Sequence, residues 1–271
     1  MKSFLRSLLL ISLLCVSSTS SKLSRSRSIT KMSMPTTSST LGSSTKTITK
    51  EIILIRHGTT EMNEVLHANP WGSKSFVDAG LWDTRLSRQG IEDAKLLNKR
   101  VLSKDSGVGD FKRVELLICS PLTRALQTAE IGLAGDVFNK DIKRIVHPLA
   151  RERLYLSSDV GRPKLELQRD YSNWNYDFLE DNEWWFVHPK DKKYIEWRPR
   201  GTYPCEGEVE DCFRERIIEL RQFLNDRPEK IIAMVCHWGV CRALTGKSLE
   251  NCEVVSIQSD RLLEEPFIDK A

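Results

Sequence analysis

The sequence lacks the long apolar run that would anchor it in a membrane. A membrane-spanning helix needs about 18 or more consecutive apolar residues, whereas the best candidate, Leu8 to Val16, is interrupted by Ser12 and stops at Ser17. We therefore expect no stable membrane insertion once the amino terminus has been processed.

The first fifty residues contain no acidic side chain, since the first carboxylate is Glu51. Eight of the 41 basic residues lie in this segment, which leaves 33 basic against 37 acidic residues in the rest of the chain. The net charge of +4 therefore belongs to a Ser/Thr-rich tail without interleaved aromatics, and the remainder is mildly acidic. This distribution gives no support to nucleic acid as a partner.

The amino-terminal segment has the layout of a targeting leader. Lys2 and Arg6 flank a short apolar run ending at Cys15 and Val16, which is typical of a secretory signal peptide, and residues 22–50 have the composition of an organelle transit peptide. We predict that residues 1–50 are a disordered, cleavable leader to an organelle or to the secretory pathway. The combination resembles the bipartite leaders of plastid proteins in algae with secondary plastids; plain secretion and a mitochondrial leader are the alternatives.

Patterns that would indicate a disulfide framework or a metal site are absent. The seven cysteines form no CxxC pair and no cysteine–histidine cluster with zinc spacing. Cys119 and Cys236 end apolar runs, so we expect them to be buried and reduced. No D-x-D carboxylate pattern suggests a magnesium phosphatase, and His67, His147 and His188 are scattered. We predict metal-independent chemistry with no cofactor.

Apolar runs and amphipathic segments alternate between residues 51 and 271. The pattern predicts an α/β fold, a single three-layer domain with a mostly parallel central sheet flanked by helices. The expected strands are 52–55, 114–118, 142–146, 231–235 and 252–257, and the expected helices are 87–102, 123–131 and 208–224.

The alternation fails between about residues 155 and 205. This segment carries Trp174, Trp184, Trp185 and Trp197 among many charges. It is too aromatic for a linker, so we predict an ordered insertion, acting either as a satellite hydrophobic cluster or as a lid that shapes substrate access.

Cationic and imidazole side chains follow three of the expected strands. Arg56-His57-Gly58 ends the first, Arg124 follows the second, and His237-Trp238-Gly239 follows the fourth. In open α/β sheets ligands bind beyond the carboxyl ends of the strands. Arginine forks match phosphate oxygens, a neutral imidazole is a nucleophile near pH 7, and glycine permits close backbone approach. Together these residues predict a phosphate site.

These motifs resemble those of a known family. Residues 54–63, LIRHGTTEMN, are similar to the RHG signature of the histidine phosphatase superfamily, the phosphoglycerate mutase-like enzymes. Further similar segments follow in order: 83–90 (D-x-x-L-T-x-x-G), 120–129 (S-x-L-x-R-A-x-Q-T-A), Arg151-Glu152 (the general-acid loop), 206–208 with Arg216 (G-E-S…R) and 236–239 (the second histidine). The resemblance spans roughly residues 52–258 and is greatest to the broad eukaryotic phosphoglycerate mutase-like subgroup.

The resemblance implies a role for each matching residue. His57 would attack phosphorus and become a phosphohistidine, with a backbone carbonyl fixing its tautomer. Arg56, Arg124 and His237 would hold the phosphoryl oxygens, and Glu152 would act as general acid and base. A second set would bind phosphate or position the loop: Gly58, Thr59 and Asn63. Glu208 would cap a helix or orient an arginine.

The resulting expectation is hydrolysis of a small phosphorylated metabolite through a phosphohistidine. The motif departures, Ser87 and Val209, do not touch the phosphoryl chemistry. No long basic substrate loop of the glycolytic mutases is present, which favours hydrolysis over transfer. The alternatives are a mutase or sugar-bisphosphatase using the same site, a non-catalytic phospho-ligand module, and a protein-interaction module built on the tryptophan-rich insertion. The oligomeric state is not readable from the sequence.

Overall fold

The structure, a computed structural model, describes residues 49–103, 107–139, 142–181, 184–185 and 208–268. The predicted leader lies outside the described residues except for Thr49 and Lys50, and so does the insertion from residue 186 to 205. None of the helices in these ranges combines the length and apolarity needed to cross a membrane.

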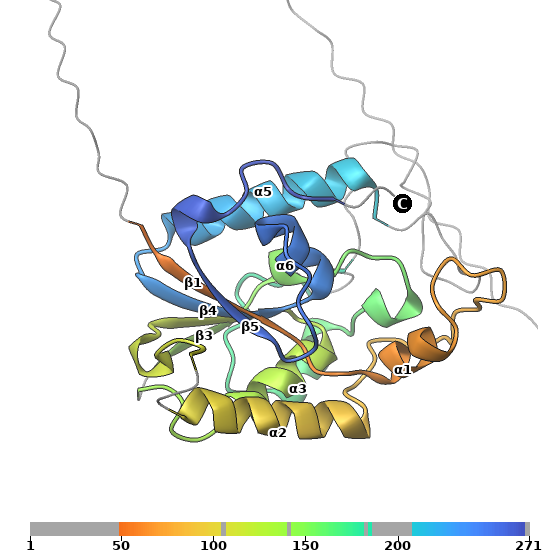
Figure 1. Ribbon diagram of the computed structural model, residues 1–271, viewed down its shortest axis with the longest axis horizontal. Coiled ribbons are helices and arrows are strands. Elements are labelled where there is room, and N and C mark those ends of the chain that lie inside the picture. Colours follow the sequence, from red (N-terminus) through yellow and green to blue (C-terminus); the bar gives the residue numbers. More distant parts are fainter. Residues whose placement is uncertain (1–48, 104–106, 140–141, 182–183, 186–207, 269–271) are drawn as a thin grey trace, which may run out of the picture. The chain divides into compact units, whose positions relative to one another are not determined.

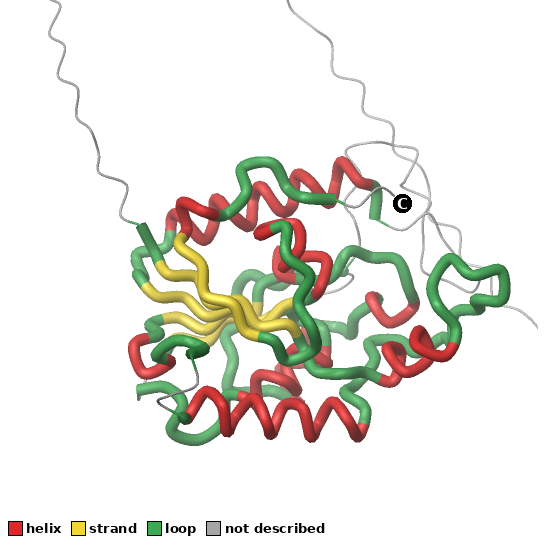
Figure 2. The backbone as a smooth tube through the Cα atoms, viewed as in Figure 1, coloured by secondary structure: helices red, strands yellow, loops and turns green. Residues whose placement is uncertain are grey.

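A five-stranded sheet forms the centre of the fold, in the order β3-β2-β4-β1-β5 (Figures 1 and 2). Among the described strands, the first four in this order are mutually parallel, and β5 alone pairs antiparallel, with β1. The strands are β1 (Glu51–Arg56), β2 (Leu116–Cys119), β3 (Lys143–Val146), β4 (Ile231–Cys236) and β5 (Val254–Gln258). The prediction of an α/β domain with a mostly parallel sheet is confirmed.

Helices cover both faces of this sheet, with α2 and α3 on one side and α5 and α6 on the other (Figure 1). The helices are α1 (Glu61–Ala68), α2 (Arg88–Leu102), α3 (Thr123–Gly132), α4 (Lys164–Asp170), α5 (Glu210–Asp226) and α6 (Trp238–Thr245). Short 3-10 turns lie at η1 (Phe111–Arg113), η2 (Pro148–Ala150), η3 (Ser157–Asp159) and η5 (Ser259–Arg261).

The buried strands supply both hydrophobic layers at once, because successive side chains point to opposite faces. In β1, Ile53 and Ile55 pack into the layer of α2 and α3, while Ile52 and Leu54 pack into the layer of α5 and α6. All four are fully buried. Burying each such side chain stabilises the fold by about 1.5–3 kcal/mol. Because both faces of the central strands are buried, their sequences are continuous apolar runs.

Local sequence signals set several helix boundaries. Ser87 caps α2 by accepting a hydrogen bond from the backbone of Gly90, a role for which serine is strongly preferred. Three helices go beyond the predicted set: α1, α4 and α6. They are only seven or eight residues long, too short for the 3.6-residue period to be distinguished in sequence.

Because β1, β2, β3 and β4 are parallel, their carboxyl ends meet at one edge of the sheet. His57, Ser120, His147 and His237 are the residues that follow them directly. The fold thus brings three of the predicted chemical segments to the same edge.

Candidate active site

A cavity of about 560 Å³ opens at this edge of the sheet. Five of the residues to which the resemblance assigns a role line it: Arg56, His57, Asn63, Arg124 and Glu152. The ring of His237 lies beside that of His57, with 5.0 Å between their centroids. The two arginines and two histidines predicted to converge are therefore brought together with Glu152.

His57 follows the last residue of β1 and is only 4% exposed. Its Nδ1 lies 2.7 Å from the carbonyl oxygen of Gly58. Since a carbonyl can only accept, Nδ1 carries the proton and Nε2 keeps its lone pair. Burial and the charges of Arg124 and Arg56 hold the pKa of His57 well below the usual value of 6.5, so the ring is neutral at pH 7 and its Nε2 is available as a nucleophile.

His237 follows β4 and forms the N-cap of α6. Its Nε2 hydrogen bonds with the hydroxyl of Ser120 at 2.7 Å, whereas its Nδ1 is buried without a partner among the described residues. Burial and the neighbouring charge of Arg124 lower the pKa of His237 well below its usual value. A buried nitrogen without a partner is costly, and this one belongs to a ring that packs beside the ring of His57.

The two arginines are held differently. Arg56 donates from Nη1 to the carbonyl of Leu249 at 2.7 Å, and its buried Nε has no partner in the described part of the chain. Arg124 at the start of α3 is 3% exposed and donates to the carbonyl of Ser158 at 2.6 Å and to the carboxylate of Asp159 at 2.8 Å. Both guanidinium groups are thereby fixed at the cavity.

Asp159 is a site residue that the sequence analysis missed. Besides its ion pair with Arg124, its second carboxylate oxygen accepts hydrogen bonds from the backbone of Tyr155 and Leu156, at 3.1 and 3.0 Å. A buried carboxylate needs such partners. The sequence held one signal for this residue: Asp159 is the one charged side chain in segment 154–160. A single charge among uncharged residues indicates a buried ion pair.

Glu152 lies on the other side of the same cavity. Its carboxylate accepts from the backbone of Arg153 at 2.8 Å and from the backbone of Gly239, in the first turn of α6, at 3.2 Å. A Cβ on Gly239 would stand 2.4 Å from Oε1 of Glu152, so only glycine permits this approach. Burial, and then the charge of Asp159, raise the pKa of Glu152 above its usual value. A carboxyl group with a raised pKa is suited to donate a proton near neutral pH.

The backbone that carries Glu152 is fixed by a buried ion cluster. Arg216 of α5 donates to the carbonyls of Arg151 and Glu152, at 2.8 and 3.4 Å, and pairs with Glu208 at 2.6 Å. Glu208 also pairs with Arg151 at 3.2 Å and is fully buried. Although burial raises the pKa of Glu208, the charges of Arg216 and Arg151 outweigh it, and the net pKa is lowered. The position of Glu208 fits the predicted role of orienting an arginine.

The three predicted loop residues lie in different surroundings. Asn63 lines the cavity and forms a capping box with Thr60 at the start of α1. Gly58 donates its N–H to the hydroxyl of Thr128 at 2.9 Å, and Thr59 donates its hydroxyl to Asp93 at 2.9 Å. Gly58 and Thr59 are not part of the cavity lining; their contacts position the loop that carries His57.

No group of three or more His, Cys, Asp and Glu side chains arranged to hold a metal ion occurs within the described ranges. His67 is exposed on α1, and His147 packs against Phe178 and Phe223. His188 lies outside the described residues.

Comparisons with known proteins show what this chain is similar to. The sequence model of the histidine phosphatase superfamily (branch 1) matches residues 52–258. A 2,3-bisphosphoglycerate-dependent phosphoglycerate mutase of Staphylococcus epidermidis is 34% identical over 86 residues, covering 32% of this chain and 31% of the relative. A probable phosphatase of Schizosaccharomyces pombe is 27% identical over 124 residues, covering 46% of this chain and 51% of the relative.

The chain thus spans about a third to a half of the length of the curated relatives it matches. Among solved structures, a phosphoglycerate mutase from Thermus thermophilus aligns with a TM-score of 0.41 and 21% identity, covering 81% of this chain and 99% of that one.

Proposed function

Because the chain belongs to the histidine phosphatase superfamily, branch 1, we propose that it hydrolyses a small phosphate monoester through a phosphohistidine on His57. The observation that carries this proposal is the buried His57 ring. Its Nδ1 is committed to the Gly58 carbonyl, so a neutral Nε2 is left beside two arginines and a second histidine.

In the first step, the lone pair of His57 Nε2 forms a bond to phosphorus while the bond from phosphorus to the ester oxygen breaks. Arg56, Arg124 and the free Nδ1 of His237 donate to the phosphoryl oxygens and stabilise the charge that gathers there. For His237 to donate from Nδ1, its Nε2 accepts the hydroxyl proton of Ser120, which the 2.7 Å contact supports.

Glu152 supplies the proton that the leaving alkoxide needs, and the alcohol departs. The resulting carboxylate then takes a proton from water as the water oxygen attacks phosphorus. The bond between phosphorus and His57 Nε2 breaks, and inorganic phosphate is released. The raised pKa of Glu152 supports both roles, because it favours the protonated form needed in the first step and makes the carboxylate a stronger base for the second.

A mutase would use the same residues and differ only in the acceptor of the phosphoryl group, which would be the product alcohol instead of water. We favour hydrolysis because the sequence has no long basic loop to exclude water. We propose that the reaction needs neither a cofactor nor a metal ion, and that the substrate is a small phosphorylated metabolite.

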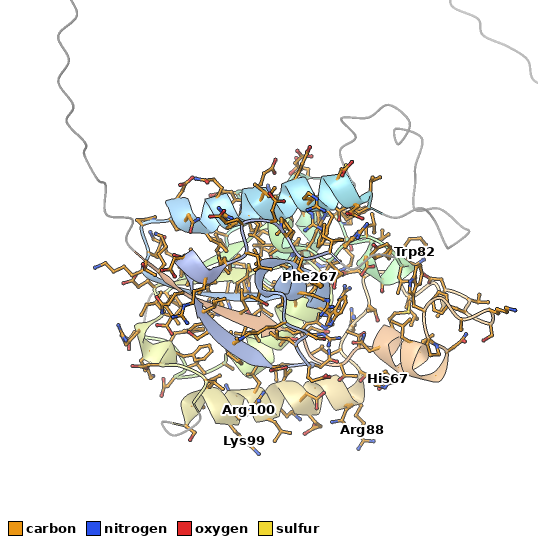
Figure 3. The ribbon with its side chains drawn as sticks, turned by 45° about the horizontal axis from the view of Figure 1, so that its top comes forward. His67, Trp82, Arg88, Lys99, Arg100 and Phe267 are labelled. Carbon is orange, nitrogen blue, oxygen red and sulfur yellow. The ribbon has the colours of Figure 1, made fainter. Side chains whose placement is uncertain are left out.

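The experiment is release of phosphate from 4-nitrophenyl phosphate by the full chain, with a chelator present. We expect native protein and His67→Ala to hydrolyse the ester, since His67 lies exposed on α1 (Figure 3), and His57→Ala to be inactive. Brief reaction with ³²P-labelled ester should leave acid-labile phosphate on native protein only. Loss of activity on chelation, or full activity of His57→Ala, would refute the proposal. Binding without turnover would indicate the phospho-ligand module.

A further inference from the structure

The cavity extends beyond the groups that handle the phosphoryl transfer. Its remaining lining is rich in large apolar side chains that come from distant parts of the chain. Six of them form what we call the outer wall: Leu66, Trp71, Tyr155, Phe213, Trp238 and Phe267. None belongs to the residues that the proposed chemistry uses.

The size of the cavity exceeds what a phosphoryl group requires. A volume of about 560 Å³ lies inside the range of roughly 300–1,000 Å³ found for pockets that enclose drug-sized ligands. Most of the cavity is therefore available to the part of the substrate that carries the phosphate, its leaving group.

Trp71 is held at the cavity although it is exposed. Its indole packs edge-on against Phe76, with 5.5 Å between ring centroids, and lies 5.8 Å from the ring of Tyr155. Hydrogen bonds from the hydroxyls of Ser73 and Ser75 to Asn69 close the loop around it. A large aromatic ring that is fixed in place and still exposed offers apolar surface to a ligand.

Two arginines stack on the same wall. The guanidinium carbon of Arg153 lies 4.7 Å from the ring centre of Tyr155, and that of Arg242 lies 4.6 Å from the ring centre of Phe267. Phe267 lies against α6, with its backbone N–H donating to Ala243 (Figure 3). Guanidinium planes and aromatic rings both favour flat, unsaturated surfaces.

A polyhydroxylated leaving group would fit this wall poorly. The indole N–H of Trp238 already donates to Ser248 at 2.8 Å, and the wall's phenyl and leucine side chains have no polar atoms. Hydroxyl groups placed against these side chains would lose hydrogen bonds to water, and the wall's remaining polar groups, the Trp71 indole N–H and the Tyr155 hydroxyl, would replace only a few of them.

We infer that the outer wall binds the leaving group, and that the preferred substrates are phosphate monoesters of a large, flat, apolar alcohol and not of a compact polyhydroxylated one. This inference rests on the proposed phosphatase function, because it assigns the other half of the same substrate.

The test compares two esters with similar leaving-group chemistry, ethyl phosphate and 2-(2-naphthyl)ethyl phosphate, hydrolysed by the full chain. Both release a primary alcohol, so the difference in kcat/KM reports the apolar body. We expect kcat/KM to be about 10- to 100-fold higher for the naphthyl ester, corresponding to burial of one aromatic group. Glucose 6-phosphate should be no better than ethyl phosphate.

Variants then locate the preference. Trp71→Ala and Phe267→Ala should each lower the naphthyl-to-ethyl ratio several-fold. Trp82→Ala is the matched control: Trp82 is 46% exposed against 48% for Trp71, but it is not part of the cavity lining, so its ratio should equal that of native protein. Melting temperatures verify that each variant is folded.

The outcomes separate the two claims. Equal kcat/KM for both alkyl esters, or a preference that survives both Trp71→Ala and Phe267→Ala, overturns the inference while the phosphatase function stands. If no ester is hydrolysed and no phosphohistidine forms, the proposed function fails and the inference falls with it.

Discussion

The two halves of the cavity are built in different ways. The inner half consists of charged and imidazole groups, each fixed by hydrogen bonds: His57 to Gly58, Arg124 to Asp159, and Glu152 to Gly239. The outer wall includes Trp71 and Phe267, which are 48% and 44% exposed and come from segments outside the regular elements. The inner groups are thus held by directed polar contacts, whereas the outer wall combines side chains from helices, such as Leu66 and Phe213, with exposed rings from loops.

The difference follows from the forces involved. A buried charge is tolerated only with partners in defined geometry, so every inner group requires others around it. Apolar contact is non-directional and scales with area, so the outer wall can be assembled from whichever segments pass near the cavity. Substitutions should therefore be severe in the inner half and graded in the outer half.

The largest expected effect is loss of an inner arginine. Arg124→Ala should lower kcat/KM by about 10³-fold, because a donor to the transferring group is removed. Arg242→Ala, the outer counterpart, should lower it by less than about 10-fold. Steady-state kinetics on ethyl phosphate measure both, and similar losses for the two variants would contradict the distinction between the halves.

The next effect concerns the buried cluster behind Glu152. Glu208→Ala leaves Arg151 and Arg216 buried without their counter-charge and should lower the free energy of unfolding by about 3–5 kcal/mol. Glu210→Ala removes only an exposed pair with Arg214 and should cost less than about 1 kcal/mol. Urea denaturation followed by circular dichroism measures the free energy of unfolding of both variants. An equally small decrease in both would show that the buried cluster does not stabilise the fold.

A smaller effect is expected from crowding Glu152, the proposed general acid. Gly239→Ala places a Cβ where Oε1 of Glu152 lies and should lower kcat for ethyl phosphate by about 10²-fold, as displacement of a catalytic group by about 1 Å can do. The loss should be smaller for 4-nitrophenyl phosphate, whose leaving group needs little protonation. A uniform loss on both esters would argue against Glu152 as the acid.

The smallest expected effect is a displaced pH profile. Several titratable or charged groups influence Glu152 or are influenced by it: Asp159, Arg124, Arg56, Cys236 and Tyr155. The negative charge of Asp159 raises the pKa of Glu152, and Asp159→Asn removes it while freeing Arg124 of its counter-ion. Both changes lower the pKa of Glu152, so the proton donor is lost at lower pH.

The basic limb of kcat for ethyl phosphate should therefore move toward lower pH in Asp159→Asn. The control is Asp181→Asn, which alters an exposed carboxylate near Lys164. In this control the basic limb should stay where it is in native protein. An unmoved limb in Asp159→Asn would mean that Asp159 only supports the loop from Tyr155 to Leu156.

Much of the inner half could be predicted from sequence because its residues lie next to strong signals. His57 and His237 directly follow continuous apolar strands, and Ser87 marks the start of α2. Asp159 and Ser120 were missed as site residues because their roles depend on partners far along the chain, Arg124 and His237. The outer wall could not be predicted at all, since Leu66, Phe213 and Phe267 belong to segments with no common pattern.

The sequence by itself determined the order of the five strands and the three longest helices, the family motifs and the candidate reacting groups, because hydrophobic periodicity and short-range spacing are local properties. Only the tertiary structure decided which carbonyl fixes the His57 tautomer, which carboxylate pairs with Arg124 and which rings line the outer part of the cavity. These depend on contacts between residues tens to hundreds of positions apart. Such contacts form only when the sheet brings its strand ends to one edge.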